Sequence, residues 1–69
     1  MTKVEARYGV NLPRKVVAVD LGSKGDLYVR FKHAARPVGE PTDDCLAIFF
    51  YEDGGSPVGV ELLDTEPFT

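Results

Sequence analysis

The residue types best suited to catalysis are one cysteine and one histidine, Cys45 and His33. A nucleophilic thiolate needs an imidazole beside it, usually oriented by a third group. Cys45 opens an apolar run and His33 ends another, so a small apolar cysteine at a strand start and a surface histidine at a strand end are the simpler interpretation. We therefore expect no catalytic residues and no enzymatic activity.

Two carboxylate pairs, Asp43–Asp44 and Glu52–Asp53, are the candidates for binding a cation. A calcium site needs six or more oxygen ligands in a fixed loop, and neither pair has that spacing. The usual zinc sets need more cysteine and histidine than this chain contains. We expect no metal and no cofactor, and we interpret both pairs as turn residues.

A glycine-rich stretch, Gly22 to Asp26, has the composition of a phosphate-binding loop. A phosphate cradle requires a helix N-terminus directly after the glycines. The residues that follow alternate between apolar and polar side chains, as in a strand. The stretch therefore predicts a turn between two strands.

Aromatic and basic residues are mixed on the strands, a combination that can stack single-stranded nucleic acid. The mixture comprises Tyr28, Arg30, Lys32, Arg36, Phe49 and Tyr51. A net charge of −3 argues against nucleic acid as a partner, and packing of aromatic rings against cations on neighbouring strands explains the mixture. We interpret part of it as a protein-binding surface on the outer face of the sheet. The candidate partner-binding residues are Tyr28, Arg30, Phe49, Tyr51 and Leu63.

The segment from Cys45 to Asp64 predicts a β-hairpin, because two β-branched and aromatic runs flank an Asp-Gly-Gly turn. Residues 15–21 and 26–33 have the composition and alternation of two further strands. Residues 3–10 also alternate and favour a strand, with a short helix as the alternative. Residues 34–44, with two prolines and a glycine, indicate a surface link without a regular element. The tail from Thr65 to Thr69 is expected to fray.

The fold class that follows is mainly β: one domain, residues 1–69, with an antiparallel meander of four to five strands. No helix is expected to cover its apolar face, and a chain this short buries too little surface to leave that face wet. The chain is therefore expected to form a homodimer that packs face to face. The predicted inner face consists of Val17, Val19, Leu27, Val29, Phe31, Leu46, Ile48, Phe50, Val58, Val60 and Leu62.

About two thirds of the chain, Val16 to Asp64, resembles the domain-of-unknown-function 2283 family of small bacterial and archaeal proteins. The matching segments are GDLYVRF at 25–31, DDCLAI at 43–48, DG at 53–54 and VGVELLD at 58–64. The resemblance implies a small β-rich domain without established activity, in some members the antitoxin-like partner of a ribonuclease-type toxin. Phe49 and Tyr51 stand where the family has acidic residues, and residues 1–14 are unmatched.

The function expected from these observations is a protein-binding module that self-associates and masks a basic partner such as a toxin. Four carboxylates would steer that partner: Glu40, Asp43, Asp44 and Glu61. The alternative is a small-ligand carrier or enzyme with a pocket at the dimer junction, where His33 and Cys45 would meet. No apolar run approaches the roughly 20 residues of a membrane span, and the N-terminus does not resemble a signal peptide. We expect a cytoplasmic protein without membrane contact.

Overall fold

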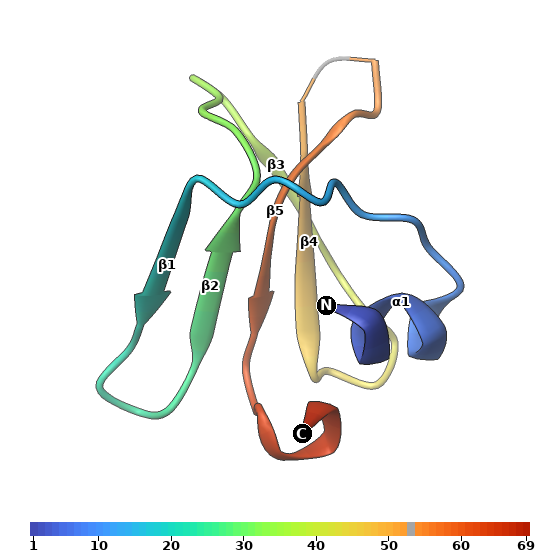
Figure 1. Cartoon of the computed structure of the whole chain (residues 1–69), viewed down its shortest axis with the longest axis vertical. Coiled ribbons are helices and arrows are strands. Elements are labelled where there is room, and N and C mark those ends of the chain that lie inside the picture. The colour runs from blue at the N-terminus through green and yellow to red at the C-terminus, as the bar shows by residue number, and fades with distance from the viewer. Residues whose placement is uncertain (53) are drawn as a thin grey trace.

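In the computed structural model, the chain folds into a five-stranded antiparallel sheet with a short helix on one face (Figure 1). The structure describes residues 1–52 and 54–69. The elements in chain order are α1 (Thr2–Tyr8), β1 (Ala18–Leu21), β2 (Leu27–Arg30), β3 (Val38–Pro41), β4 (Ala47–Tyr51), β5 (Pro57–Leu62) and the 3-10 helix η1 (Glu66–Phe68). The predicted class, mainly β and antiparallel, is confirmed.

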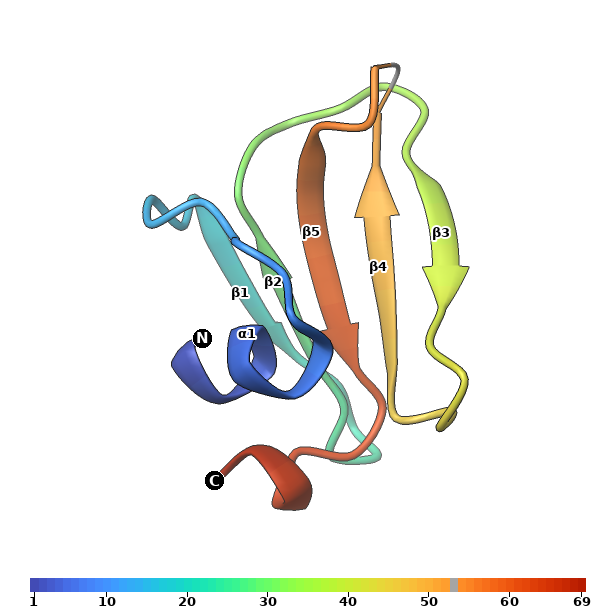
Figure 2. The same ribbon diagram turned by 90° about the vertical axis from the view of Figure 1, so that its right-hand side faces the viewer.

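The order of strands across the sheet is β1-β2-β5-β4-β3, and every neighbouring pair is antiparallel. Strands β3, β4 and β5 form a meander, and β1 and β2 form a separate hairpin. The segment after β2 arches past the ends of β5 and β4 to reach β3 (Figure 2). As a result, β2 pairs with β5, with Val29 opposite Val60, and β5 lies at the centre of the sheet with a partner on each side.

The N-terminal segment is a helix and not the expected strand. Val4 and Tyr8 lie four residues apart, so they share the helix face that packs on the sheet. Gly9 ends the helix in the left-handed conformation, with φ +65°, and its N–H donates to the carbonyl of Glu5 at 2.9 Å. The Glu5 carboxylate then accepts the N–H of Leu12 at 2.8 Å, which fixes the chain as it leaves the helix.

The 34–44 link also differs from expectation, because β3 lies within it. Pro41 is compatible with β3 because the strand is at the edge of the sheet, where a missing N–H leaves no neighbour unpaired. The hairpin between β4 and β5 is confirmed: Gly54 and Gly55 both have positive φ, and Glu52 donates its N–H to the carbonyl of Ser56 at 3.1 Å. Asp53, the first residue of the predicted turn, lies outside the described residues.

The glycine-rich stretch forms the predicted turn. Gly22 donates its N–H to the carbonyl of Asp26 at 2.8 Å, and Gly25 has φ +86°. Strand β2 begins directly afterwards, at Leu27. No helix N-terminus follows the glycines, so this stretch lacks the geometry of a phosphate cradle.

The inner face of β4 is opposite to the one predicted. Phe49, 6% exposed, pairs with Val60, and Ala47 pairs with Leu62, so these side chains share the buried face. A shift of one residue exchanges the two faces of a strand, and β4 is apolar on both. The prediction that Leu46, Ile48 and Phe50 face the core was therefore wrong. Five residues of the predicted inner face are buried: Val29, Phe31, Val58, Val60 and Leu62.

The expectation that no helix covers the apolar face was also wrong. Val4 of α1 is 1% exposed and lies within the core cluster. The tail is ordered as η1, and Phe68 packs against the core, with its ring centroid 6.1 Å from that of Tyr8. Figure 2 shows α1 and η1 on the same side of the sheet. This cover is partial, because Val19 and Leu21 of β1 remain 59% and 75% exposed.

In the described part of the chain the other face of the sheet carries no helix, and aromatic side chains lie along it. The rings of Tyr28 and Phe50 are 5.2 Å apart between centroids, and the guanidinium carbon of Arg30 lies 5.3 Å from the Tyr28 ring centroid. Gly59 lies beneath Tyr28: a Cβ at this position would be 2.9 Å from the carbonyl oxygen of Val29 and 3.1 Å from the Tyr28 ring. The absence of a side chain at Gly59 thus allows Tyr28 to lie across the central strand.

The face assignment of β4 can be tested with two neighbouring phenylalanines. Phe49→Ala should lower the free energy of unfolding by about 3–5 kcal/mol, because it removes a buried ring. Phe50→Ala should cost about 1–2 kcal/mol, because it removes a half-buried ring that stacks on Tyr28. Urea denaturation followed by circular dichroism measures both values. A larger loss for Phe50→Ala would contradict the register.

Candidate functional site

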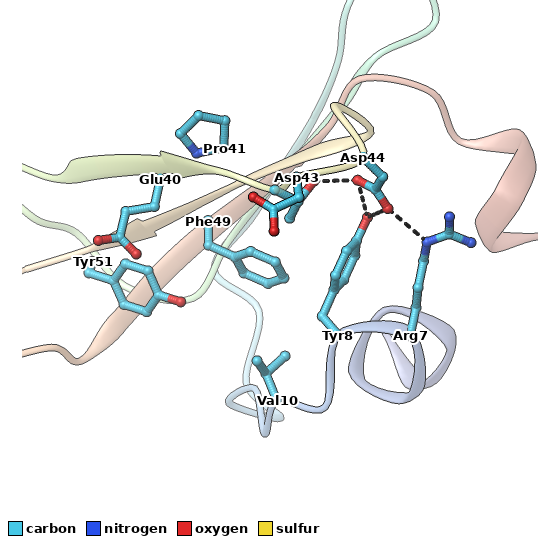
Figure 3. A pocket seen from close by; sticks show the side chains of 10 residues that line it. Arg7, Tyr8, Val10, Glu40, Pro41, Asp43, Asp44, Phe49 and Tyr51 are labelled. Atoms are coloured by element: carbon cyan, nitrogen blue, oxygen red, sulfur yellow. Dashed lines mark hydrogen bonds and ion pairs between the residues drawn. The ribbon is translucent and has the colours of Figure 1, made fainter.

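An open groove of about 590 Å³ lies where α1 meets β3, β4 and the turn between them (Figure 3). It is lined by Arg7, Tyr8, Val10, Glu40, Pro41, Thr42, Asp43, Asp44, Phe49 and Tyr51. Helix, turn and sheet each contribute one wall, so the groove depends on the tertiary fold and not on one continuous motif.

Asp44 holds the helix wall to the turn. Its carboxylate accepts hydrogen bonds from the Tyr8 hydroxyl at 2.9 and 3.1 Å, from Arg7 Nε at 3.1 Å, and from the hydroxyl of Thr42. It also accepts the backbone N–H of Leu46 at 3.1 Å. These donors come from α1 and from both sides of the turn, so a single side chain joins the two segments.

These contacts strongly favour the ionised form of Asp44. The Thr42 hydroxyl contributes most, and the Leu46 N–H, Tyr8 and Arg7 add to it, so the pKa of Asp44 lies well below its usual range. The same contact raises the pKa of Arg7. Because Asp44 is already bonded on both oxygens, we assign it the role of positioning the helix.

Glu40 and Asp43 are the carboxylates of the groove that remain available. Among the described residues, the ion pairs join Arg7 to Asp44, Arg30 to Asp20 and Lys32 to Glu52, and none of them includes Glu40 or Asp43. Three carboxylates and one guanidinium line the groove, which leaves it with a net charge of −2. The groove therefore favours positively charged groups.

Aromatic and aliphatic side chains form the floor between these charges. Glu40 pairs with Phe49 across β3 and β4, so the two side chains lie on the same face of the sheet. The Phe49 ring in turn meets Tyr8 edge to face, with 5.4 Å between centroids and an interplanar angle of 85°. Figure 3 shows Tyr51 beside Glu40, and Val10 on the opposite side of the groove.

The predicted partner-binding residues do not share one face. Tyr28 and Arg30 lie on the open face of the sheet, and Leu63 follows β5, partly exposed. Phe49 and Tyr51 lie on the covered face, where Phe49 is buried and half-buried Tyr51 lines the groove. Phe49 packs against the N-terminal helix through the ring of Tyr8.

The predicted steering carboxylates also divide. Glu40, Asp43 and Asp44 line the groove together. Glu61 is directly opposite Tyr28 in the register and therefore lies on the open face. Burial, and then the hydrogen bond with Asp26, raises the pKa of Glu61.

His33 and Cys45 lie at opposite ends of the sheet. His33 follows the C-terminal end of β2, whereas Cys45 precedes the N-terminal end of β4, and both strands run antiparallel to β5 between them. The two side chains therefore do not form a nucleophile–base pair within one chain. Cys45 is exposed and adopts φ +61° in the β3–β4 turn.

Arg7 and Tyr8 are two of the groove residues that the sequence did not suggest. Both were assigned to a strand, and the available signal for a helix was the spacing of Val4 and Tyr8 followed by Gly9. Over residues 1–52 and 54–69, no three His, Cys, Asp or Glu side chains are grouped as a metal site would require. No helix in the described part of the chain has both the length and the apolar character to cross a membrane.

Replacing Asp44 should destabilise the fold in a pH-dependent way. Its folded-state pKa is depressed, so its stabilisation is present above the unfolded pKa, about 3.9, and is lost as the pH falls toward the folded value. Asp44→Asn should lower the urea midpoint of unfolding at pH 7, and the difference in midpoint between variant and parent should become smaller below about pH 4. The control is Asp43→Asn, which should change the midpoint little. The role of Asp44 would be contradicted if both variants changed the midpoint equally, or if the difference in midpoint between Asp44→Asn and the parent did not change with pH.

Comparison with known proteins found no match for this chain, whether among family models, curated proteins or solved structures. The geometry and charge of the groove are therefore the basis for assigning a function.

Proposed function

We propose that the chain is a protein-binding module whose groove takes a basic segment of a partner protein. The observation that supports this most is the pair of carboxylates Glu40 and Asp43 beside the aromatic floor of an open groove. Neither has an ion-pair partner among residues 1–52 and 54–69. A cationic side chain would gain both charge complementarity and apolar contact in this setting.

Lysine and arginine have the right shape for such a groove. Their aliphatic stems pack on apolar surface while their charged ends reach polar groups, here Tyr51 and Val10 for the stem and Glu40 or Asp43 for the charge. A cation over the Tyr51 ring would add a cation–π contact. Exposed ion pairs contribute about 0.2–1 kcal/mol each, so a specific partner needs several basic residues and an apolar anchor.

An antitoxin-like role is one form of this function, and it rests on the family resemblance. Proteins that bind RNA carry basic surfaces that contact the phosphate backbone. A ribonuclease-type toxin would therefore present the kind of surface that the groove favours. Binding would mask the active site of such a toxin sterically, with no reaction performed by this chain.

Titration with an N-acetylated hexa-arginine amide, followed by amide chemical shifts in NMR, tests the proposal. The shifts should concentrate at Arg7, Tyr8, Tyr51 and the 40–44 segment. The double variant Glu40→Gln/Asp43→Asn should weaken binding roughly three- to tenfold, as expected for the loss of two exposed ion pairs.

The matched control is Glu61→Gln/Glu66→Gln, which changes the net charge equally and alters no residue lining the groove. It should preserve both the affinity and the location of the shifts. Equal weakening by the two double variants would mean that net charge alone attracts the peptide, and the groove would be excluded as the binding site.

A further inference from the structure

Strand β1 is an unprotected edge of the sheet. Among the described elements its one neighbour is β2, and none of them lies beyond β1 (Figure 1). Natural proteins usually protect such edges with proline, lysine or other charges. The opposite edge, β3, contains Pro41 and Glu40, whereas β1 combines two strongly exposed apolar residues, Val19 and Leu21, with one charge, Asp20.

The backbone of β1 offers a row of hydrogen-bonding groups on its free side. The bond from Gly22 N–H to the Asp26 carbonyl identifies these two residues as a hydrogen-bonded pair of the ladder. Such pairs alternate with non-hydrogen-bonded ones along antiparallel strands. Val19 and Leu21, an odd number of residues before Gly22, therefore direct their N–H and C=O groups away from β2.

We propose that β1 pairs antiparallel with β1 of a second copy of this chain, which joins the two sheets edge to edge. A two-fold axis through Val19 would place the two Val19 residues opposite each other, and Leu21 opposite Val17. The Val17 N–H already donates to the Arg30 carbonyl of its own chain at 2.8 Å, so the bonds between the copies would come from the N–H and C=O of Val19, the N–H of Leu21 and the C=O of Val17. The side chains of Val19 and Leu21 point to the face that carries α1, beyond the part that the helix covers. Pairing would thus bring the exposed apolar residues of both copies together.

The charges on the other face select this register. With the axis at Val19, Asp20 stands opposite Ala18 of the second copy. Arg30 stands opposite Ala18 within its own chain, so Arg30 of each copy would reach across the small alanine toward Asp20 of the other. Within one chain this arginine is already 3.7 Å from Asp20, with both side chains partly exposed.

The register shifted by one residue is disfavoured by Asp20. An axis through Asp20 would place two carboxylates directly opposite each other, which destabilises a strand pair. The alignment centred on Val19 is therefore favoured over the one centred on Asp20. The groove lies beside β3 at the far edge, so this dimer leaves both grooves open, and it does not depend on what they bind.

Sedimentation velocity between about 10 µM and about 1 mM tests the dimer, because a short edge contact lies at the weak end of protein interfaces. The parent should pass from monomer to dimer over this range. Val19→Lys should raise the dimer dissociation constant at least about tenfold, since two lysines would meet at the axis. Val38→Lys on β3 is the matched control, with nearly equal exposure in the parent, 61% against 59%, and it should leave dimerisation unchanged.

Val19→Pro distinguishes edge pairing from a dimer formed by stacked faces. Proline removes an N–H that points away from β2, so the β1–β2 ladder keeps its bonds and the edge loses a donor. Dimerisation should be lost in this variant. In the parent protein, amide exchange at Val19 and Leu21 should slow as concentration rises, a measurement that needs no substitution.

Three results would overturn the proposal. The first is a parent that remains monomeric at about 1 mM. The second is equal weakening by Val19→Lys and Val38→Lys. The third is exchange at Val19 and Leu21 that does not change with concentration, which would show that a dimer forms through another surface.

Discussion

The pairing of Phe49 with Val60 decides which side of the sheet becomes the core. Strand β4 has apolar residues on both faces, and the central strand β5 accepts it in one register. Once Phe49 faces Val60, its ring is available to Tyr8, and α1 packs on that side and not on the other. The position of the helix, the groove and the open face all follow from this alignment.

A helix of seven residues is too short to be stable by itself in water. Burial of Val4 holds one end of it, and the carboxylate of Asp44 holds Arg7 and Tyr8 near the other. Asp44 pairs with the helix cation Arg7, and in the described part of the chain its neighbour Asp43 is in no ion pair while lining the groove. The contact that stabilises the helix thus also shapes the surface to which we assign binding.

Local sequence patterns were sufficient for much of the sheet. The glycines at 54 and 55 and the alternation of Val58, Val60 and Leu62 predicted the central hairpin and its buried face. They were insufficient for β4, because alternation cannot orient a strand whose two faces are both apolar. They failed for residues 2–8 because Val4 and Tyr8 satisfy both strand alternation and helical spacing.

The groove was harder to predict than the strands, because its walls are distant in the chain. Glu40, Asp43 and Asp44 were recognised as charges that could steer a partner, and they do lie together. Their neighbours Arg7 and Tyr8 were not recognised, because their place beside the turn depends on a helix that was assigned as a strand. Long-range contacts of this kind leave little trace in local composition.

Gly59 limits how the open face can change during evolution. Any side chain at this position would press on the carbonyl oxygen of Val29 as well as on the Tyr28 ring. Loss of the Tyr28 ring would therefore still not allow a side chain at position 59, since the carbonyl oxygen of Val29 would remain in the way. Substitution of the glycine, in contrast, would displace the ring and its stack with Phe50. Tyr28 can therefore be replaced more readily than Gly59. In a set of divergent relatives, sequence variation at position 28 should greatly exceed variation at position 59.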